Sequence, residues 1–400
     1  MAVACYIHYP QLFLNLFMTS LDSCYNIADL RAQAKRKLPA PMFHYIDGGA
    51  DDEWTLQRNS QAFSDYQIIP NHLRNIESID LRTNVLGASL DLPFFLAPTG
   101  MSRLFHHQKE PAACRAANEA GTLYSLSTLA TTSLEEVAVS SDGPKMFQIY
   151  VLKDRGLTRE FVQRCKDSHY QALCLTVDTT VAGNRERDLR NGMTMPPKIT
   201  MKNFFSYGTS FEWLFNLLLN SDFKLANVAH RVDALGKNAM GLIDYVNSQF
   251  DRTITWDDAA WLAEQWNGPF VIKGLQSVAD VKKARDIGAT GVMISNHGGR
   301  QLDGAPAPVD CISVLREAVG TDLELICDGG IRRGTDIIKA IGLGADACSI
   351  GRPYLYGLAA GGQLGVARAI DILKTELERS LALMGCCSIG DVSREQVVRL

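Results

Sequence analysis

One histidine, in the segment S-N-H-G-G-R (295–300), is the side chain of this sequence best suited to move a proton. It follows a short apolar run and precedes two glycines, a pattern that exposes the ring edge and leaves space for a ligand. A lone histidine is often only a hydrogen-bonded structural residue. Asp178 closes a second apolar run and could accept a hydrogen bond from the ring of His297, which would stabilise its protonated form. The two residues together predict an acid–base pair.

Two arginines stand close to this pair in the sequence. Arg185 lies shortly after Asp178, and Arg300 shortly after His297. Guanidinium groups bind carboxylates through paired, charge-assisted hydrogen bonds, so two of them at one site would suit a carboxylate ligand. Each arginine could instead form an ordinary ion pair with a neighbouring acid, which would be Glu186, Asp188 or Asp303. Because both arginines flank a candidate base, we favour the binding site.

Glycine-rich segments that carry arginine follow two further apolar runs. They are D-G-G-I-R-R-G (328–334) and I-G-R-P (350–353). Glycines let backbone N–H groups approach a phosphate closely, and an arginine adds positive charge. These segments predict a site for a phosphorylated substrate or for a cofactor such as FMN. Lys273, within the run F-V-I-K-G, would point into the interior and need an anionic partner, which a reduced flavin would supply.

All these residues close or follow short apolar runs that alternate with helical patterns. The runs span residues 92–98, 122–127, 145–150, 172–178, 270–274, 291–296, 324–330 and 347–353. Parallel strands need crossover connections, so eight such runs imply a parallel sheet. Their total span is close to the ~250 residues of a (β/α)8 barrel, in which active sites lie at the carboxyl ends of the strands. We therefore predict an α/β fold, a TIM barrel. An open doubly wound sheet is the alternative, but no G-x-G-x-x-G follows the first strand.

The segments outside this alternation complete the predicted organisation. An N-terminal helical segment should consist of two helices, the first stopped near Pro39 and Pro41 and the second ended at Gly48-Gly49. A long helix over 363–383 should lie against the barrel exterior. We interpret residues 1–22 as an apolar leader or disordered tail, with no chemical role for residues 1–17, and residues 23–400 as a single domain.

The loop after the fourth strand carries an insertion at about residues 189–250. Its middle places apolar residues at helical spacing, namely Phe211, Leu214, Phe215 and Leu218, with Trp213 beside them. Such a helix could pack within the protein or between subunits, cover the mouth of the site, or lie on a membrane surface. The spacing alone does not choose among these alternatives.

Composition limits the partners and the location of the protein. With 40 Lys and Arg residues against 44 Asp and Glu residues, the net charge of −4 gives no reason to expect nucleic acid as a partner. The ten cysteines form no C-x-x-C pair, so we expect no metal site. We also expect the thiols to be reduced and the protein to lie in the cytoplasm. No apolar run reaches the ~18 residues of a membrane-spanning helix, and no signal peptide is predicted.

Three motifs resemble those of a known family. They are S-N-H-G-G-R-Q-L-D (295–303), D-G-G-I-R-R-G-T-D (328–336) and L-T-V-D-T (175–179). The chain resembles, from about Asn26 to Asp391, the FMN-dependent L-2-hydroxy acid dehydrogenases and oxidases, and most of all the bacterial respiratory L-lactate dehydrogenases. The resemblance implies that bound FMN oxidises an L-2-hydroxy acid to a 2-keto acid.

The resemblance also implies a role for each matching residue. His297 is similar to the family's active-site base, and Asp178 to its partner. Ligands of the substrate carboxylate and hydroxyl would be Tyr45, Arg185, Arg300 and Tyr150, with Tyr150 also counted as catalytic. The flavin ring would be contacted by Pro98, Thr99, Gly100, Ser127, Gln148, Thr176 and Lys273. The ribityl chain and phosphate would be bound by Ser295, Asp328, Gly329, Gly330, Ile331, Arg332, Gly351 and Arg352.

Two positions indicate the subtype within this family. Gly100 stands where the oxidases usually carry Ala and the dehydrogenases Gly, and Leu129 stands where glycolate oxidases carry Trp. Both favour a dehydrogenase for a short substrate such as L-lactate, which is oxidised to pyruvate. Asn184 departs from the Arg of glycolate oxidases. The alternatives are a mandelate dehydrogenase, an H2O2-forming oxidase, an FMN-dependent isomerase and a non-catalytic flavin-binding module.

Further expectations about partners rest on the same resemblance. The electron acceptor would be a respiratory quinone or a similar compound. Residues 204–219 would contact the inner membrane, on whose cytoplasmic face the protein would be peripheral. Family members are commonly homo-oligomers, so a tetramer is expected.

Overall fold

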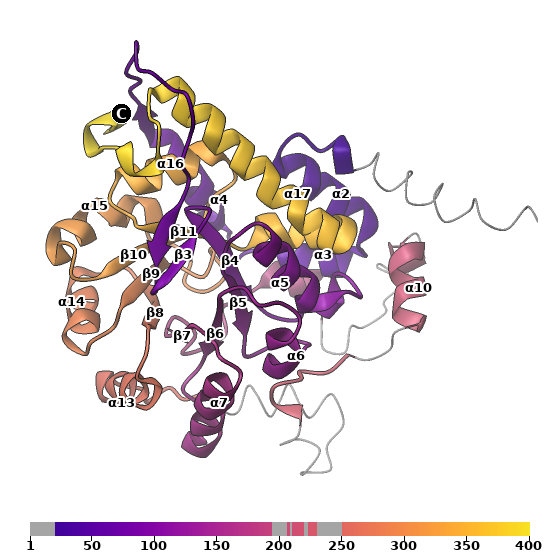
Figure 1. Cartoon of the computed structure of the whole chain (residues 1–400). Coiled ribbons are helices and arrows are strands. Elements are labelled where there is room, and N and C mark those ends of the chain that lie inside the picture. Colours follow the sequence, from indigo (N-terminus) through magenta and orange to yellow (C-terminus); the bar gives the residue numbers. More distant parts are fainter. Residues whose placement is uncertain (1–20, 194–205, 209, 220–222, 230–249) are drawn as a thin grey trace, which may run out of the picture.

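A closed barrel of parallel strands forms the centre of the molecule (Figure 1). The computed structural model describes residues 21–193, 206–208, 210–219, 223–229 and 250–400. The barrel strands are β4 (Phe94–Thr99), β5 (Tyr124–Ser127), β6 (Lys145–Ile149), β7 (Ala172–Thr176), β8 (Phe270–Leu275), β9 (Gly291–Ser295), β10 (Glu324–Asp328) and β11 (Ala347–Ile350). They follow one another in sequence order around the barrel, and β11 pairs with β4 to close it. This closing pair confirms the predicted barrel and is incompatible with an open sheet.

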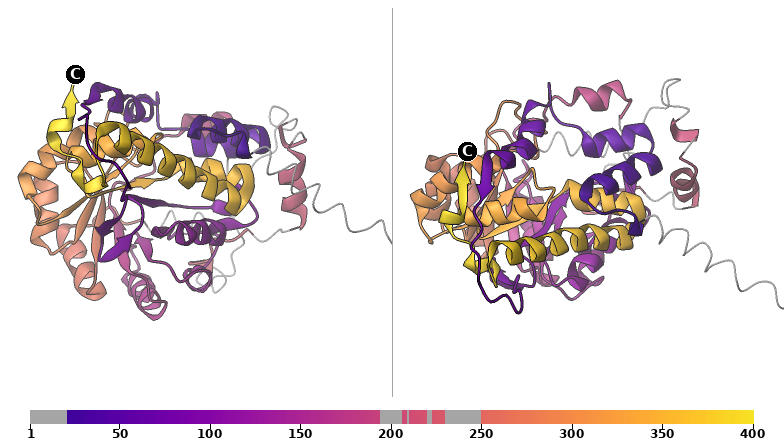
Figure 2. Two further views of the ribbon diagram at one scale, coloured as in Figure 1. Left: turned by 45° about the horizontal axis from the view of Figure 1, so that its top comes forward. Right: turned by 90° about the horizontal axis from the view of Figure 1, so that it is seen from above.

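Helices surround the barrel, as the alternating pattern predicts (Figures 1 and 2). They are α5 (Lys109–Glu119), α6 (Leu134–Ala138), α7 (Arg155–Asp167), α13 (Trp256–Trp266), α14 (Val278–Asp286), α15 (Pro308–Val319), α16 (Gly334–Gly342) and α17 (Arg352–Met384). The backbone of α17 leaves helical geometry at Gly361 and Gly362. Its part beyond this kink is the helix expected over 363–383.

The barrel interior is filled near the amino ends of its strands. A hairpin of β2 (Thr83–Val85) and β3 (Ala88–Leu90) contributes to this packing. Side chains of the hairpin and of the strands form one buried cluster, which includes Val85, Leu86, Leu90, Phe95, Met146, Val271, Met293 and Ile326. Strands that are buried on both faces must be apolar throughout, which explains the continuous apolar runs in the sequence. Space for a ligand is therefore left at the carboxyl ends.

The N-terminal helices lie against α17, with α2 (Ile27–Lys37) packed along it (Figure 1). Asn26 caps α2 by accepting a hydrogen bond from the backbone N–H of Asp29. The next helix, α3 (Ala40–Asp47), ends before Gly48, so both expected helices are present. A further helix, α4 (Trp54–Gln61), was not predicted.

Both ends of the described chain are fixed to the barrel domain. Near the C-terminus, β12 (Val397–Arg399) pairs antiparallel with β1 (Tyr66–Ile68). Of the predicted leader, Leu21 is buried and Asp22 is exposed, whereas residues 1–20 lie outside the described residues.

The insertion after β7 is described in part. It contains α8 (Glu186–Arg190) and α10 (Phe211–Leu219), so the predicted helix in its middle is confirmed. One side of α10 faces the barrel, where the indole N–H of Trp213 donates to the carbonyl of Leu104 at 2.8 Å. The side chains of Phe211, Phe215 and Leu219 are 76%, 61% and 64% exposed. The side chain of Leu218 lies outside the described part, and the apolar stripe points mainly away from the barrel.

Two general expectations can be compared with the described residues. Their nine cysteines are all free, and most are buried. Among the described helices, none combines the length and the apolar character needed to cross a bilayer.

Candidate active site

A cavity of about 880 Å³ opens at the carboxyl ends of the barrel strands. Every residue expected at the site lines this cavity except Asp178 and Ser295, which lie directly behind lining residues. The topology explains this agreement, because residues that end parallel strands meet at one end of a barrel. The assigned roles of the individual residues remain predictions.

The structure brings His297 and Asp178 together. The Nδ1 atom of His297 lies 2.9 Å from Oδ1 of Asp178, which leaves Nε2 available to a substrate. Burial would raise the pKa of Asp178, but the positive charges of His297 and Lys273 outweigh it and lower that pKa. The carboxylate is therefore ionised and oriented to stabilise a protonated imidazole.

A strained turn presents the histidine to the cavity. His297 has a φ of +58°, a left-handed backbone conformation that residues other than glycine rarely adopt. Gly298 follows with a φ of +65°, and a Cβ atom there would lie only 2.7 Å from Nη1 of Arg352. The glycine that the sequence places after the histidine is thus required by both the turn and the close approach of an arginine.

The two arginines converge on Tyr45. The guanidinium carbon of Arg300 lies 4.8 Å from the centre of the Tyr45 ring, and that of Arg185 lies 5.9 Å from it. Burial and the charge of Arg185 lower the pKa of Arg300. Two cations and a phenol ring therefore meet in one corner of the cavity, an arrangement that suits a carboxylate ligand.

Among the described residues, no ion pair joins Arg185 or Arg300 to the acids weighed as alternatives, although the charge of the buried Asp188 opposes the lowering of the pKa of Arg300. Nη1 of Arg300 donates to the carbonyls of Tyr45 and Gly48, at 2.6 and 3.0 Å. The carboxylate of Asp303 instead accepts hydrogen bonds from the backbone N–H groups of Thr55 and Trp54. Glu186 pairs with Arg190.

Lys273 has an anionic partner within the protein. Its Nζ atom lies 3.0 Å from Oδ2 of Asp328, on a strand two places along the barrel, and donates to Oγ of Ser295 at 2.9 Å. The Ser295 hydroxyl donates to the same carboxylate at 2.6 Å. Burial disfavours the charged amine, but the carboxylates of Asp328 and Asp178 outweigh it and raise the pKa of Lys273. The lysine is therefore a buried cation, and a flavin is not its only source of compensating charge.

Tyr150 and Leu129 line the same cavity as the histidine and the arginines. The ring of Tyr150 packs edge-on against Phe250, with centroids 4.9 Å apart. Burial and the charge of Asp178 raise the pKa of Tyr150, so its hydroxyl stays protonated and can donate. Leu129 contacts Gly100, and its carbonyl accepts a hydrogen bond from the backbone of Met101 at 2.9 Å.

Unpartnered polar atoms in the cavity fit a flavin ring. Nε2 of Gln148 and Oγ1 of Thr176 are buried and have no hydrogen-bond partner among the described residues. Both residues line the cavity, at the ends of the neighbouring strands β6 and β7. Buried polar groups are normally paired, so these atoms indicate a ligand with a polar edge. The nitrogen and oxygen atoms along one edge of isoalloxazine would satisfy them.

Positive charge and glycines fit the phosphate end of FMN. Arg352 is half-buried, and its guanidinium donates to the carbonyls of Ile46, Gly298 and Gly48, at 3.0, 2.9 and 2.8 Å. These three bonds leave two of its five N–H groups for a phosphate. Arg332, Gly329 and Gly330 lie along the same wall of the cavity, where both glycines have positive φ.

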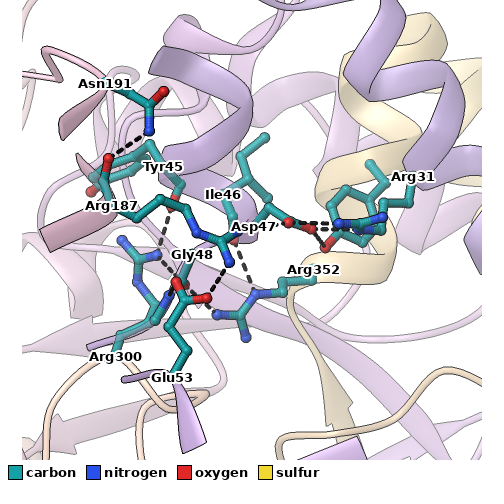
Figure 3. A network of polar contacts seen from close by, with 12 residues as sticks. Arg31, Tyr45, Ile46, Asp47, Gly48, Glu53, Arg187, Asn191, Arg300 and Arg352 are labelled. Carbon is teal, nitrogen blue, oxygen red and sulfur yellow. Dashed lines mark hydrogen bonds and ion pairs between the residues drawn. The ribbon is translucent and has the colours of Figure 1, made fainter. Parts of the chain in front are cut away.

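Several residues of the site were not predicted. Phe105 stacks on Tyr45 with ring centroids 6.3 Å apart, and Phe250 closes over Tyr150. Asp47 and Arg187 form ion pairs behind the arginine cluster (Figure 3). The segment F-H-Y-I-D-G-G-A contains Asp47 two positions after Tyr45, which is a signal that could have been followed. Phe250 ends a long insertion and carries no such signal.

Comparisons with known proteins show the family to which the chain belongs. The family model described as FMN-dependent dehydrogenase matches residues 34–399. A protein of Mycobacterium tuberculosis named "Putative L-lactate dehydrogenase" is 40% identical over 381 residues, which cover 95% of this chain and 90% of that protein. Glycolate oxidase of Spinacia oleracea is 38% identical over 376 residues, which cover 93% and 95%.

A solved structure extends the likeness to the whole fold. The crystal structure of the monotopic membrane protein (S)-mandelate dehydrogenase superposes with a TM-score of 0.91 at 32% identity, covering 94% of this chain and 100% of that one. The relatives are named for three different 2-hydroxy acids, which are lactate, glycolate and mandelate. The chain belongs to the family of FMN-dependent dehydrogenases and is an FMN-dependent 2-hydroxy acid oxidoreductase.

Proposed function

We propose that this enzyme oxidises L-lactate to pyruvate. The observation that carries the proposal is the convergence, in one cavity, of the His297–Asp178 pair with two arginines packed on Tyr45. Bound FMN would supply the acceptor for the two electrons and for one of the two hydrogens that leave the substrate, and His297 would accept the other hydrogen as a proton. Gln148 and Thr176 would hold the ring edge, and Arg352 with Arg332 would hold the phosphate.

The side chains around the cavity would bind the substrate and move its proton. Arg185 and Arg300 bind the substrate carboxylate and so fix the 2-carbon beside His297. Nε2 of His297 accepts a proton from the substrate, and the Asp178 carboxylate stabilises the imidazolium that results. The protonated hydroxyl of Tyr150 donates to the oxygen on the 2-carbon, where negative charge develops as the ketone forms. These steps need a carboxylate and a hydroxyl on adjacent carbons, which a 2-hydroxy acid provides.

The proposed choice of lactate rests on the part of the cavity wall that Leu129 forms. Leu129, rather than a larger aromatic residue, lies against Gly100, and both line the cavity. An aliphatic wall of this kind suits the methyl group of lactate. A relative named as an L-lactate dehydrogenase supports the same choice. The carboxylate site counts against an isomerase acting on phosphorylated substrates and against a module without catalysis.

We also propose that a respiratory quinone accepts the electrons at a membrane surface. The exposed side chains of Phe211, Phe215 and Leu219 on α10, within the segment 204–219, would contact the cytoplasmic face of the inner membrane. A structural neighbour described as a monotopic membrane protein supports peripheral attachment. A homotetramer is proposed from the family resemblance alone.

Anaerobic mixing of the FMN-loaded protein with single acids tests the substrate. The panel contains L-lactate, D-lactate, glycolate and (S)-mandelate, and the readout is the rate at which the flavin absorbance bleaches. We expect L-lactate to reduce the flavin fastest and D-lactate not at all. Faster reduction by (S)-mandelate or glycolate would replace the lactate assignment. A second run with a soluble quinone and with oxygen as competing acceptors separates a dehydrogenase from an H2O2-forming oxidase.

A further inference from the structure

The last turn of α3 connects the candidate carboxylate site with the candidate phosphate site (Figure 3). On the side of the turn nearest the cavity, Arg300 donates to the carbonyls of Tyr45 and Gly48. Arg352 donates to the carbonyls of Ile46 and Gly48. Gly48 therefore accepts from both guanidinium groups, and its carbonyl is a shared support for two sites that bind different ligands.

The other side of the turn is held by one buried carboxylate. Asp47 accepts from Nε and Nη2 of Arg31 at 2.6 and 2.7 Å, from Nη1 of Arg187 at 3.0 Å, and from the hydroxyl of Tyr356 at 2.8 Å. Burial would raise the pKa of Asp47, but these hydrogen bonds and the charges of Arg31 and Arg187 bring it to about 2. Asp47 thus joins α3 to three other helices, α2, α8 and α17.

The same network reaches the second arginine of the carboxylate site. Arg187 lies in the first turn of α8, two residues after Arg185, and it also pairs with Glu53. Glu53 in turn accepts from the backbone N–H of Gly49 at 2.8 Å. A displacement of the α3 turn would therefore move Tyr45, Arg185 and Arg300 together, and would also change the support of Arg352.

The α3 turn also compensates the positive charges of Arg300 and Arg352. The hydrogen bonds found for Arg300 and Arg352 are with backbone carbonyls rather than with a carboxylate. Carbonyls at the end of a helix carry partial negative charge, so their position decides how well two desolvated cations are compensated. If the turn moves, the orientation of both cations changes at once.

We propose that Asp47 is a positioning residue that fixes the last turn of α3 and thereby sets the guanidinium groups of Arg300 and Arg352 for the substrate carboxylate and the FMN phosphate. The inference rests on the proposed function for the identity of these two ligands. It assigns Asp47 no contact with either of them. It has a distinctive consequence: one substitution outside both binding sites should weaken the binding of both ligands.

The test compares Asp47→Asn with a matched control, Asp310→Asn. Asp310 also accepts from an arginine, Nη2 of Arg58 at 2.9 Å, and from a tyrosine hydroxyl, that of Tyr66 at 2.9 Å, but neither partner belongs to the network around the α3 turn. Both variants keep the side-chain volume and lose the charge. Four quantities are measured on the purified protein: the Kd of FMN, the Kd of pyruvate from the change in flavin absorbance, and the KM and kcat for L-lactate.

We expect Asp47→Asn to raise the Kd of both FMN and pyruvate, and the KM for L-lactate, by about ten- to a hundred-fold, because small misplacements of binding groups have effects of this size. The kcat should fall less, and Asp310→Asn should leave all four quantities near their original values. The proposal would be overturned by equal effects in the two variants. It would also be overturned if Asp47→Asn changed the Kd of only one of the two ligands. Arg31→Gln, in a side chain that is 46% exposed, gives a milder version if Asp47→Asn does not fold.

The outcome can be separated from that of the proposed function. If L-lactate does not bleach the flavin of the unmodified protein, the lactate assignment is wrong. The proposed role of Asp47 is not affected by that result. The Kd of FMN does not depend on the substrate, and the acid that does bleach the flavin can replace L-lactate in the comparison, with its keto acid replacing pyruvate.

Discussion

Gly100 and Leu129 touch across two neighbouring loops of the candidate active site. A Cβ atom on Gly100 would lie 3.1 Å from both Cβ and the carbonyl oxygen of Leu129. The loop of Leu129 is fixed by the buried carboxylate of Glu110, which accepts from the backbone of Ser102 at 3.2 Å and from that of Thr131 at 2.8 Å. Because one carboxylate holds both loops, neither can easily withdraw from an added methyl group.

Gly100→Ala should therefore narrow the cavity at Leu129. Overpacking of this kind costs about 1–3 kcal/mol, and we expect a lower melting temperature. The loss in kcat/KM should be greater for (S)-mandelate than for L-lactate, since the larger acid needs the space. Gly208→Ala is the control, because a Cβ atom there meets nothing within 4 Å. Equal losses for the two acids would show that Leu129 does not border the substrate side chain.

Leu129→Ala should have the opposite effect on selectivity. Removing the side chain enlarges the wall on which the methyl group of lactate is proposed to rest, so kcat/KM should fall for L-lactate and rise for (S)-mandelate. A single pocket contact of this size changes selectivity by about ten- to two-hundred-fold. The measurement is the ratio of the two kcat/KM values. An unchanged ratio would place the substrate side chain elsewhere in the cavity.

His297→Gln tests the proposed base. The amide can still hydrogen-bond to Asp178 but cannot take up a proton, so turnover should fall by about a hundred- to ten-thousand-fold. FMN should remain bound, because the ring-edge and phosphate ligands are unchanged, and the flavin absorbance of the purified variant checks this. A variant with nearly normal turnover would remove His297 from the proposed mechanism.

The sequence predicts those parts of this site that follow from the strand pattern. His297 and Asp178 lie far apart in the chain, yet both end parallel strands, and the closure of the barrel makes their meeting predictable. The same reasoning does not reach Asp47, because its partners Arg31, Arg187 and Tyr356 come from helices whose packing no periodicity encodes. Helix α10 was predictable as an amphipathic segment, but the direction of its apolar side depends on Trp213 bonding to Leu104.

Lys273 shows a second limit of sequence reasoning. An interior lysine predicts an anion nearby, and that expectation is correct. The sequence favoured a flavin as the anion, whereas the structure places Asp328 at 3.0 Å. The side chains of β8 and β10 meet across the barrel interior, and no local pattern identifies which of the strand-end carboxylates will do so.

Stability in acid should report the ionisation of Asp47. Its pKa is lowered from 3.8 to about 2 in the folded protein. The contribution of a carboxylate with a depressed pKa is present in full above pH ~4 and is lost as the pH falls toward 2. The shift corresponds to about 2 kcal/mol. Urea unfolding should show the native protein more stable than Asp47→Asn at pH 5, with the difference shrinking as the pH approaches 2. A difference that does not depend on pH would exclude the carboxylate charge as its cause.

The buried pair of Lys273 and Asp328 gives a final test, in which a double substitution should lower the stability of the protein less than a single one. Lys273→Met leaves the Asp328 carboxylate buried without its cation, at a cost of about 3–5 kcal/mol. Adding Asp328→Asn removes the stranded charge, while Ser295 and Ser349 can still hydrogen-bond to the amide. Thermal unfolding in saturating FMN should therefore give a higher melting temperature for the double variant than for Lys273→Met alone. If the lysine served only to balance charge on the flavin, the second substitution would restore nothing, because the flavin would still lack its cation.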